Sequence, residues 1–247
     1  MNDEFMLRYA RHLMLDGFGF EGQERLTNSK VLILGLGGLG SPVAMYLAAA
    51  GVGHLTLVDD DNVELSNLQR QIIHKTDNIG LKKVDSARQT LLALNPLVQI
   101  KTFPDRPSVD EITALIEGVD LVLDCSDNYN TRQVLNKICV DLKKPLVAGA
   151  AIKWEGMVTS FDFREPTSPC YACLFDPEDN LAPDNCATLG VFSPLLGVIG
   201  SMQAVEAIKL LIGEGDTLVG KLAIFNAKTS NWRYLDIKKN TYCTVCQ

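Results

Sequence analysis

The sequence lacks an excess of positive charge. Its 247 residues contain 23 lysines and arginines against 30 aspartates and glutamates, a formal net charge of -7 at pH 7. Binding along a nucleic acid needs a basic surface, so this balance excludes general nucleic-acid binding. It still allows a local basic pocket for one nucleotide. The N-terminus, MNDEFMLRYARHLML, begins acidic and has no basic region followed by an apolar core. It is therefore not expected to be a signal peptide, and we expect a cytoplasmic protein.

Charge is missing altogether from residues 185–205. That length is close to the ~20 residues of a membrane-spanning helix. However, the stretch contains Pro194, Gln203 and three glycines, and its first part is typical of a loop. We therefore expect a buried helix there, at a subunit interface for example, and no membrane association.

What the chain does contain is an alternation of short apolar runs and helical patterns. Strands are expected at 30–34, 54–59, 99–103, 121–125 and 145–149, and helices at 1–28, 41–50, 81–94, 109–116 and 131–142. This order predicts an α/β fold: a Rossmann-like, mainly parallel sheet with helices on both faces. Beyond residue 149, strands at 157–163 and 222–226 predict a C-terminal antiparallel region. We expect a single domain over 1–247, with N-terminal helices (1–28), a nucleotide-binding part (29–149) and a C-terminal part (150–247).

A glycine-rich loop follows the first expected strand. Gly35, Gly37 and Gly40 fit the pattern G-x-G-x-x-G, and Gly38 adds a fourth glycine. Such a loop lets the backbone approach phosphate oxygens at a helix N-terminus. Asp59 ends the second strand, where a carboxylate accepts hydrogen bonds from ribose hydroxyls.

An NAD-dependent dehydrogenase would share these features. It would also need a catalytic acid or base beside a substrate site, and the three histidines, His12, His54 and His74, are in no such setting.

The segment after Asp59 carries a more specific pattern. The run Ser66-Asn67-Leu68-Gln69-Arg70, together with Lys83 and Asp127-Asn128, resembles the nucleotide-binding signature of the MoeB/ThiF/HesA adenylyltransferases. The resemblance covers nearly the whole chain. Within the family, residues 149–156 and 194–201 look more like MoeB than ThiF.

The resemblance implies that this signature binds ATP with Mg²⁺. Attack of a carboxylate on the α-phosphate brings anions together, so cations must offset the developing charge. Arg70 and Lys83 are the candidates to hold phosphate oxygens, and Asn67 could donate to phosphate or ribose. Asp127 follows an apolar strand and could hold Mg²⁺, while Asn128 could order that loop. The resemblance also implies that Arg11 reaches into the active site of a second subunit, which would make the protein a homodimer.

Two C-x-x-C pairs, Cys170/Cys173 and Cys243/Cys246, lie about 70 residues apart. Four thiolates can form a closed tetrahedral Zn²⁺ site, and the family has the same pairs at the same places. The alternative is a redox disulfide, but neither pair opens a helix in a thioredoxin-like setting.

The other cysteines are expected to differ in role. Cys186 stands in a polar loop before the uncharged helix, and the family leaves two roles open for it. It could be a nucleophile that links covalently to the carrier, or it could be dispensable. Cys125 and Cys139 are expected to be small core residues.

The resemblance implies adenylylation of the C-terminal Gly-Gly carboxylate of a ubiquitin-fold sulfur-carrier protein. The first choice is a MoaD-like carrier of molybdenum cofactor biosynthesis, and the second is a ThiS-like carrier of thiamine biosynthesis. Because the sequence ends just after Cys246, a separate sulfur donor is expected. Phe175 and Phe192 are candidates for carrier docking.

Two further alternatives remain. One is a non-catalytic scaffold, although the nucleotide-site residues are all present. The other is activation of a different carboxylate by a related enzyme, which is expected to lack the cysteine pairs.

Overall fold

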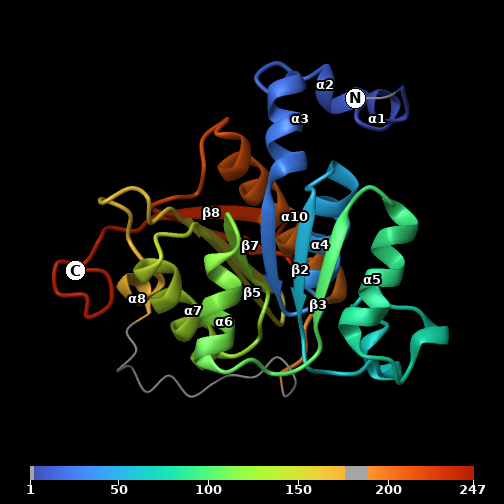
Figure 1. Cartoon of the computed structure of the whole chain (residues 1–247). Helices are drawn as coiled ribbons and strands as arrows, with labels where there is room; N and C mark the ends of the chain where they lie inside the picture. The colour runs from blue at the N-terminus through green and yellow to red at the C-terminus, as the bar shows by residue number, and fades with distance from the viewer. Residues whose placement is uncertain (1–2, 176–188) are drawn as a thin grey trace.

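One eight-stranded sheet, in the order β3-β2-β1-β4-β5-β6-β7-β8, organises the computed structural model (Figure 1). The structure describes residues 3–175 and 189–247. The strands are β1 (Lys30–Leu34), β2 (His54–Val58), β3 (Gln99–Phe103), β4 (Leu121–Asp124), β5 (Leu146–Ile152), β6 (Glu155–Phe161), β7 (Lys221–Asn226) and β8 (Asn231–Asp236).

The first five strands are parallel, as the alternation of strands and helices predicts. β1 lies between β2 and β4, with Leu34 opposite both Val58 and Asp124. The chain segments that leave β1, β2 and β4 therefore start side by side at the carboxyl edge of the sheet. In an open α/β sheet, ligands bind in the crevice outside this edge.

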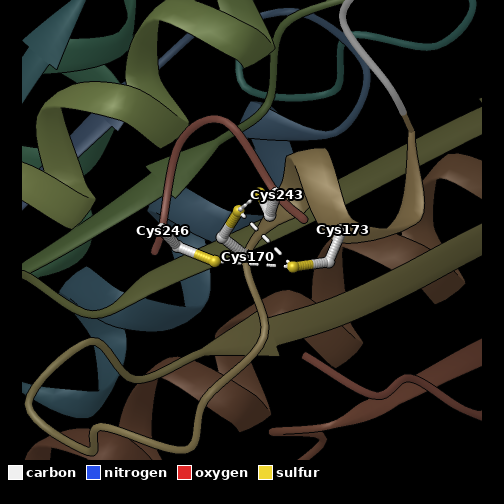
Figure 2. A group of neighbouring side chains, drawn as sticks. All are labelled: Cys170, Cys173, Cys243 and Cys246. Atoms are coloured by element: carbon white, nitrogen blue, oxygen red, sulfur yellow. Dashed lines mark hydrogen bonds between the residues drawn. The ribbon is translucent and has the colours of Figure 1, made fainter. Parts of the chain in front are cut away.

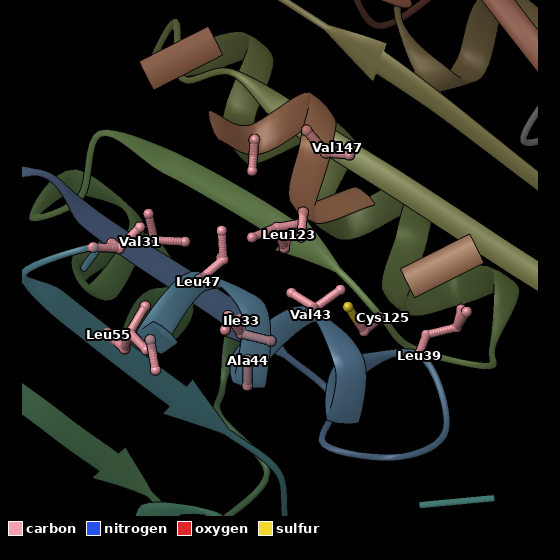
Figure 3. Packing of buried hydrophobic residues seen from close by; sticks show 14 of the residues in the cluster. Val31, Ile33, Leu39, Val43, Ala44, Leu47, Leu55, Leu123, Cys125 and Val147 are labelled. Atoms are coloured by element: carbon pink, nitrogen blue, oxygen red, sulfur yellow. The ribbon is translucent and has the colours of Figure 1, made fainter. Parts of the chain in front are cut away.

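Helices cover both faces of the parallel strands. The helices are α4 (Gly40–Ala50), α5 (Lys83–Leu94), α6 (Val109–Glu117), α7 (Tyr129–Asp141) and α10 (Ser193–Ile212). One apolar cluster joins α4, α5 and α10 to one face, and a second joins α6 and α7 to the other. Figure 3 shows α4 packing Val43 and Leu47 against Ile33 of β1 and Leu123 of β4. The expected layers are confirmed.

The antiparallel region is longer than the sequence predicted. β5 turns into β6 through a tight hairpin at Lys153 and Trp154, and β7 and β8 extend the sheet antiparallel. β6 starts two residues earlier than expected. β8 was not predicted: most of its residues are exposed, although Trp232 and Tyr234 alternate with polar residues as in a half-buried strand.

The N-terminal region is not one continuous helix. It forms α1 (Asp3–Arg8), α2 (Ala10–Leu13) and α3 (Gly19–Asn28), with Gly17 at φ +76° in the turn before α3. Figure 1 shows α1 and α2 beyond the amino ends of the strands, on the side away from the carboxyl edge. Tyr9 anchors them, since its hydroxyl accepts from Nδ2 of Asn95 at 2.8 Å.

The uncharged stretch does contain a long apolar helix, α10. By length and composition it is the one described helix that could cross a membrane, yet it packs in the core of the protein. Gly200 lets it approach α4 closely, because a Cβ there would lie 2.5 Å from the Pro42 ring and 2.6 Å from the Leu39 carbonyl oxygen. The expectation of a buried helix is confirmed.

Candidate functional site

A cavity of about 1090 Å³ opens at the carboxyl edge of the parallel strands. The predicted site residues in its wall come from four separate segments: the glycine loop after β1, the end of β2 with the turn that follows, the start of α5, and the loop after β4. The predicted site residues that line it are Gly35, Gly37, Gly38, Asp59, Gln69, Arg70, Lys83, Asp127 and Asn128.

The glycine loop is as tight as the motif requires. Gly35 has φ +91°, a conformation that side chains strongly disfavour. Gly40 does not line the cavity. Its role is packing, because a Cβ on Gly40 would lie 1.9 Å from the carbonyl oxygen of Gly35. Gly38 is pressed from outside by α10, since its Cβ would meet Leu196 at 2.5 Å.

Two side chains hold the peptide groups of Leu36, between the first two glycines of the motif. The Leu36 N–H donates to Asp59 Oδ2 at 2.6 Å. The Leu36 carbonyl lies 3.0 Å from His74 Nε2, and His74 Nδ1 lies 2.9 Å from Ser86 Oγ on α5. Burial lowers the pKa of His74, so the ring is neutral at pH 7, with Nε2 donating and Nδ1 accepting. The loop is thus tied both to β2 and to α5.

Asp59 faces the cavity and also accepts hydrogen bonds from backbone N–H groups of the protein. Its second oxygen, Oδ1, accepts from the Asp61 N–H at 3.0 Å. Burial raises the pKa of Asp59, and nearby Lys83 and the two backbone donors offset part of that rise. A carboxylate with lone pairs left over at this position can still accept from ribose hydroxyls.

Lys83 is buried at the first position of α5, with its ammonium group in the cavity wall. Its Nζ lies 2.7 Å from Oδ2 of Asp61, whose side chain is 68% exposed. One solvated carboxylate is a weak partner, so the ammonium can exchange it for a phosphate oxygen.

In the turn after β2, some residues line the cavity and others only stabilise the turn. Ser66, Asn67 and Leu68 do not line the cavity. Asn67 caps a short 3-10 helix instead, with Oδ1 accepting from the Glu64 N–H at 3.1 Å. Arg70 does line the cavity, and its Nη1 donates to the Ser66 carbonyl at 2.9 Å, which fixes the guanidinium beside the glycine loop.

Asp127 is exposed to the cavity, three residues beyond the end of β4. Asn128 is the N-cap of α7, because Oδ1 accepts from the Thr131 N–H at 2.8 Å. The loop between them and β4 is held from below by Asp124, which accepts from Ser126, and by Arg132, which donates to the Ser126 carbonyl at 2.7 Å. An exposed carboxylate on a fixed loop suits a Mg²⁺ ligand.

Sequence reasoning missed several residues of this site. Asp61, Gln71 and Arg132 line the cavity, and His74 supports it from behind. Asp61 lies between Asp59 and the run of residues 66–70, and Gln71 directly follows that run, so position was the available signal for them. Nothing in the sequence around His74 or Arg132 shows that a fold places them at the loops.

Arg11 lies outside the cavity of its own chain. It is exposed on α2, at the amino edge of the sheet. Cys186 lies outside the described residues. Cys125 and Cys139 are buried in the two apolar clusters, as expected, and burial raises the pKa of both thiols.

The two C-x-x-C pairs meet in space (Figure 2). Sγ of Cys170 lies 3.6 Å from that of Cys243, and Sγ of Cys173 lies 3.5 Å from that of Cys246. Four sulfurs around one zinc at about 2.3 Å would lie about 3.8 Å apart, so the cluster has the size of a tetrahedral site. The four cysteines are free thiols, and the Asn240 N–H points at Cys173 Sγ, a common second contact of a metal-bound thiolate.

Comparison with known proteins agrees with this geometry. Residues 9–245 match the ThiF family. The chain belongs to the ThiF family. It is 48% identical to the molybdopterin-synthase adenylyltransferase of Salmonella typhimurium and 47% identical to that of Escherichia coli K12, each over 100% of this chain and 98% of the relative. It is also 47% identical to the adenylyltransferase and sulfurtransferase MOCS3-1 of Drosophila pseudoobscura pseudoobscura, of which it spans 54%.

Solved structures share the ThiF-family fold. E. coli MccB with MccA-N7isoASN superposes with a TM-score of 0.85 at 23% identity, over 97% of this chain and 75% of MccB. PaaA superposes with a TM-score of 0.83 at 27% identity, over 97% of this chain and 76% of PaaA. The Rossmann-like sheet and its antiparallel extension are therefore the fold of this ThiF-family chain.

Proposed function

We propose that this chain is an ATP-dependent adenylyltransferase that activates the C-terminal Gly-Gly carboxylate of a MoaD-like, ubiquitin-fold sulfur carrier in molybdenum cofactor biosynthesis. One observation carries the proposal. A chain 48% identical, end to end, to a molybdopterin-synthase adenylyltransferase gathers Asp59, Arg70, Lys83 and Asp127 around one glycine loop.

The reaction needs charge compensation more than acid–base chemistry. A carboxylate oxygen of the carrier forms a bond to the α-phosphorus of ATP, and the bond from that phosphorus to the bridging oxygen breaks. Pyrophosphate leaves, and an acyl adenylate remains. Arg70 and Lys83 offset the negative charge on the phosphate oxygens, and the glycine loop holds the nucleotide in place.

Two metal ions complete the proposal. Asp127 would hold Mg²⁺, which neutralises phosphate charge when ATP is bound. Zn²⁺ would sit in the cluster of Cys170, Cys173, Cys243 and Cys246. With four thiolates that site has no open position for a substrate, so its role is to pin the C-terminal tail to the segment that follows β6.

We further propose a homodimer in which Arg11 serves the cavity of the other subunit. The cavity of the same chain lies at the opposite edge of the sheet from α2, and Arg11 does not line it. Arg11 is therefore free to reach the cavity of a second subunit. Leu7 and Met14, at either side of it, are 79% and 74% exposed, as expected for apolar residues that a second subunit covers.

The carrier would dock on the open face of the antiparallel strands. Met157, Ile224 and Arg233 are cross-strand neighbours on this face, and all three line the cavity. The other face is covered by α10. Of the two predicted docking residues, Phe175 lines the cavity and packs on Tyr171, whereas Phe192 stacks on Trp154 at the nearby hairpin and does not line it.

A separate protein would deliver the sulfur to the acyl adenylate. Cys125 lines the cavity, but burial raises the pKa of its thiol, so it is a poor sulfur nucleophile at neutral pH. The six described cysteines are all free thiols, which supports a reducing, cytoplasmic location.

The deciding experiment is ATP–pyrophosphate exchange with Mg²⁺ and a panel of MoaD-like and ThiS-like carriers ending in Gly-Gly. We expect exchange that depends on a MoaD-like carrier and disappears in Asp127→Ala. Exchange with the ThiS-like carrier alone would move the reaction to thiamine biosynthesis. ATP binding without exchange for any carrier would favour a scaffold, and exchange without a carrier would contradict the proposal.

A further inference from the structure

Asn136 is a fully buried amide that lies between α7 and the cysteine cluster. It belongs to α7, and Val140, about one turn further along that helix, packs against the cluster. Its Oδ1 accepts from the N–H of Tyr171 at 2.8 Å. Tyr171 directly follows Cys170, at the start of the short helix α8 (Tyr171–Leu174). Asn136 therefore holds the backbone of the first C-x-x-C pair.

The other end of this amide has no partner. Nδ2 of Asn136 makes no hydrogen bond with any of the described residues, although the side chain is completely buried. An amide with its two ends exchanged would place an N–H group against the Tyr171 N–H, so the contact with Tyr171 fixes the nitrogen at the unpartnered end. A buried donor without an acceptor destabilises a protein, and such groups are rare in native structures.

The group on which this donor acts is the sulfur of Cys170. Burial raises the pKa of the Cys170 thiol to about 11, and the Asn136 side chain opposes that rise, because a donor beside the sulfur favours the thiolate. Cys170 is one of the four cysteines whose sulfurs gather within reach of a single ion (Figure 2). A thiol accepts hydrogen bonds weakly, whereas a charged thiolate accepts them strongly. The acceptor that suits Nδ2 is therefore Cys170 in its metal-bound form.

A cluster of zinc-bound thiolates needs donors of this kind. Four thiolates outweigh the charge of one Zn²⁺, so the occupied cluster is a buried anion, which is costly unless hydrogen-bond donors surround it. The backbone supplies one such donor, since the Asn240 N–H lies 3.3 Å from Cys173 Sγ. Asn136 offers a donor from a side chain, which a substitution can remove.

We propose that Asn136 is a positioning residue of the zinc centre: its Nδ2 donates to the Cys170 sulfur when that sulfur is a zinc-bound thiolate, while its Oδ1 holds the Tyr171 N–H. The inference rests on the proposed zinc site and deepens it. One buried side chain thereby offsets charge on a metal ligand, fixes the backbone beside that ligand, and ties the cluster to α7.

The first test compares Asn136→Leu, which removes the amide at similar size, with the wild type. Competition with a chelator gives the Kd for zinc, and the Co²⁺-substituted protein gives the energy of the sulfur-to-cobalt charge-transfer bands. We expect the Kd for zinc to rise about 10- to 100-fold. We also expect the bands to move to longer wavelength, because a sulfur that has lost a hydrogen-bond donor gives up its electrons more easily.

Asn95→Leu is the matched control. Asn95 is an equally buried amide, but its Nδ2 donates to Tyr9 and Ala48 and to no residue of the cluster. Its replacement should lower Tm and leave both the Kd for zinc and the charge-transfer bands unchanged.

A second test uses the wild type and so does not depend on the folding of a variant. In protein loaded with ¹¹³Cd and labelled with ¹⁵N-asparagine, a hydrogen bond from an N–H group to a metal-bound sulfur transmits a coupling between the cadmium nucleus and the proton. We expect this coupling at the side-chain N–H of Asn136. The backbone N–H of Asn240, which points at Cys173, is the internal control.

An unchanged Kd and unchanged bands in Asn136→Leu would overturn the inference and leave the proposed function intact. A raised Kd without a shift of the bands would also overturn it, because Asn136 would then stabilise only the backbone. Coupling of ¹¹³Cd to Asn240 without coupling to Asn136 would have the same meaning. If the wild type binds no metal at the cluster, the proposed zinc site fails as well.

Discussion

The two halves of the sheet acquire their functional groups in different ways. In the parallel half, most predicted groups of the cavity lie within a few residues of a strand end or helix start: the glycine loop after β1, Asp59 after β2, Lys83 at the start of α5, and Asp127 after β4. In the antiparallel half, Cys170 and Cys243 meet although 73 residues separate them. Local sequence motifs therefore encode the first site, whereas chain topology assembles the second.

This difference predicts that damage to the two halves will have different signatures. Replacing a group of the parallel half should reduce the reaction and spare stability. Replacing a cysteine of the cluster should reduce stability, because the bound metal there joins distant segments of chain. The following predictions test that contrast, beginning with the largest effect.

The largest expected effect is on stability, in Cys243→Ser. Loss of a metal ligand should release the ion and cost on the order of 5 kcal/mol, a fall in Tm of roughly 10–20 °C. Differential scanning calorimetry and metal analysis check both parts, with about one zinc per chain expected in the wild type. Cys139→Ala, which removes a buried thiol outside the cluster, should keep its zinc. A zinc-free wild type of full stability would contradict the structural role.

The next effect should appear in the reaction alone, in Lys83→Met. This change keeps the buried stem and removes the ammonium group, so Tm should change little while pyrophosphate exchange falls about 100- to 1000-fold. Lys82→Met is the matched control. The neighbouring Lys82 is half-buried and does not line the cavity, and its Nζ donates to the Asp60 carbonyl, so exchange should stay within about 2-fold. An equal loss of pyrophosphate exchange in Lys83→Met and Lys82→Met would contradict a specific role of Lys83.

A smaller effect is expected for the support of the glycine loop. His74→Leu removes the donor to the Leu36 carbonyl, and we expect the KM for ATP to rise about 10-fold with a smaller change in kcat. His74→Gln, whose amide can donate to the same carbonyl, should recover part of the loss. Steady-state kinetics at varied ATP concentration measures the KM for ATP and kcat separately for each variant. If both variants lose activity equally and only in kcat, His74 does not act through the loop.

The smallest expected effect lies on the open face of the antiparallel strands. Ile224→Ala should raise the KM for the carrier about 3- to 5-fold, as one modest apolar contact is lost, and leave the KM for ATP unchanged. Leu235→Ala, on the edge strand β8, gives a second point on the same face. A change in the KM for ATP without a change for the carrier would place the docking surface elsewhere.

The sequence by itself determined the parallel half almost completely. Apolar runs and helical patterns there are local, so the strands β1 to β5 and the helices between them appear within a few residues of their expected positions. Gly35, Asp59, Lys83 and Asp127 follow from the same local order, because parallel strands bring their carboxyl ends to one edge.

Tertiary structure alone decided the rest. β8 is mostly exposed and forms the edge of the sheet through its pairing with β7. The use of His74 and Gln71 at the glycine loop depends on contacts between distant segments. Such side-chain contacts form only where the packing of helices and strands brings distant residues together. A local sequence pattern therefore does not predict them.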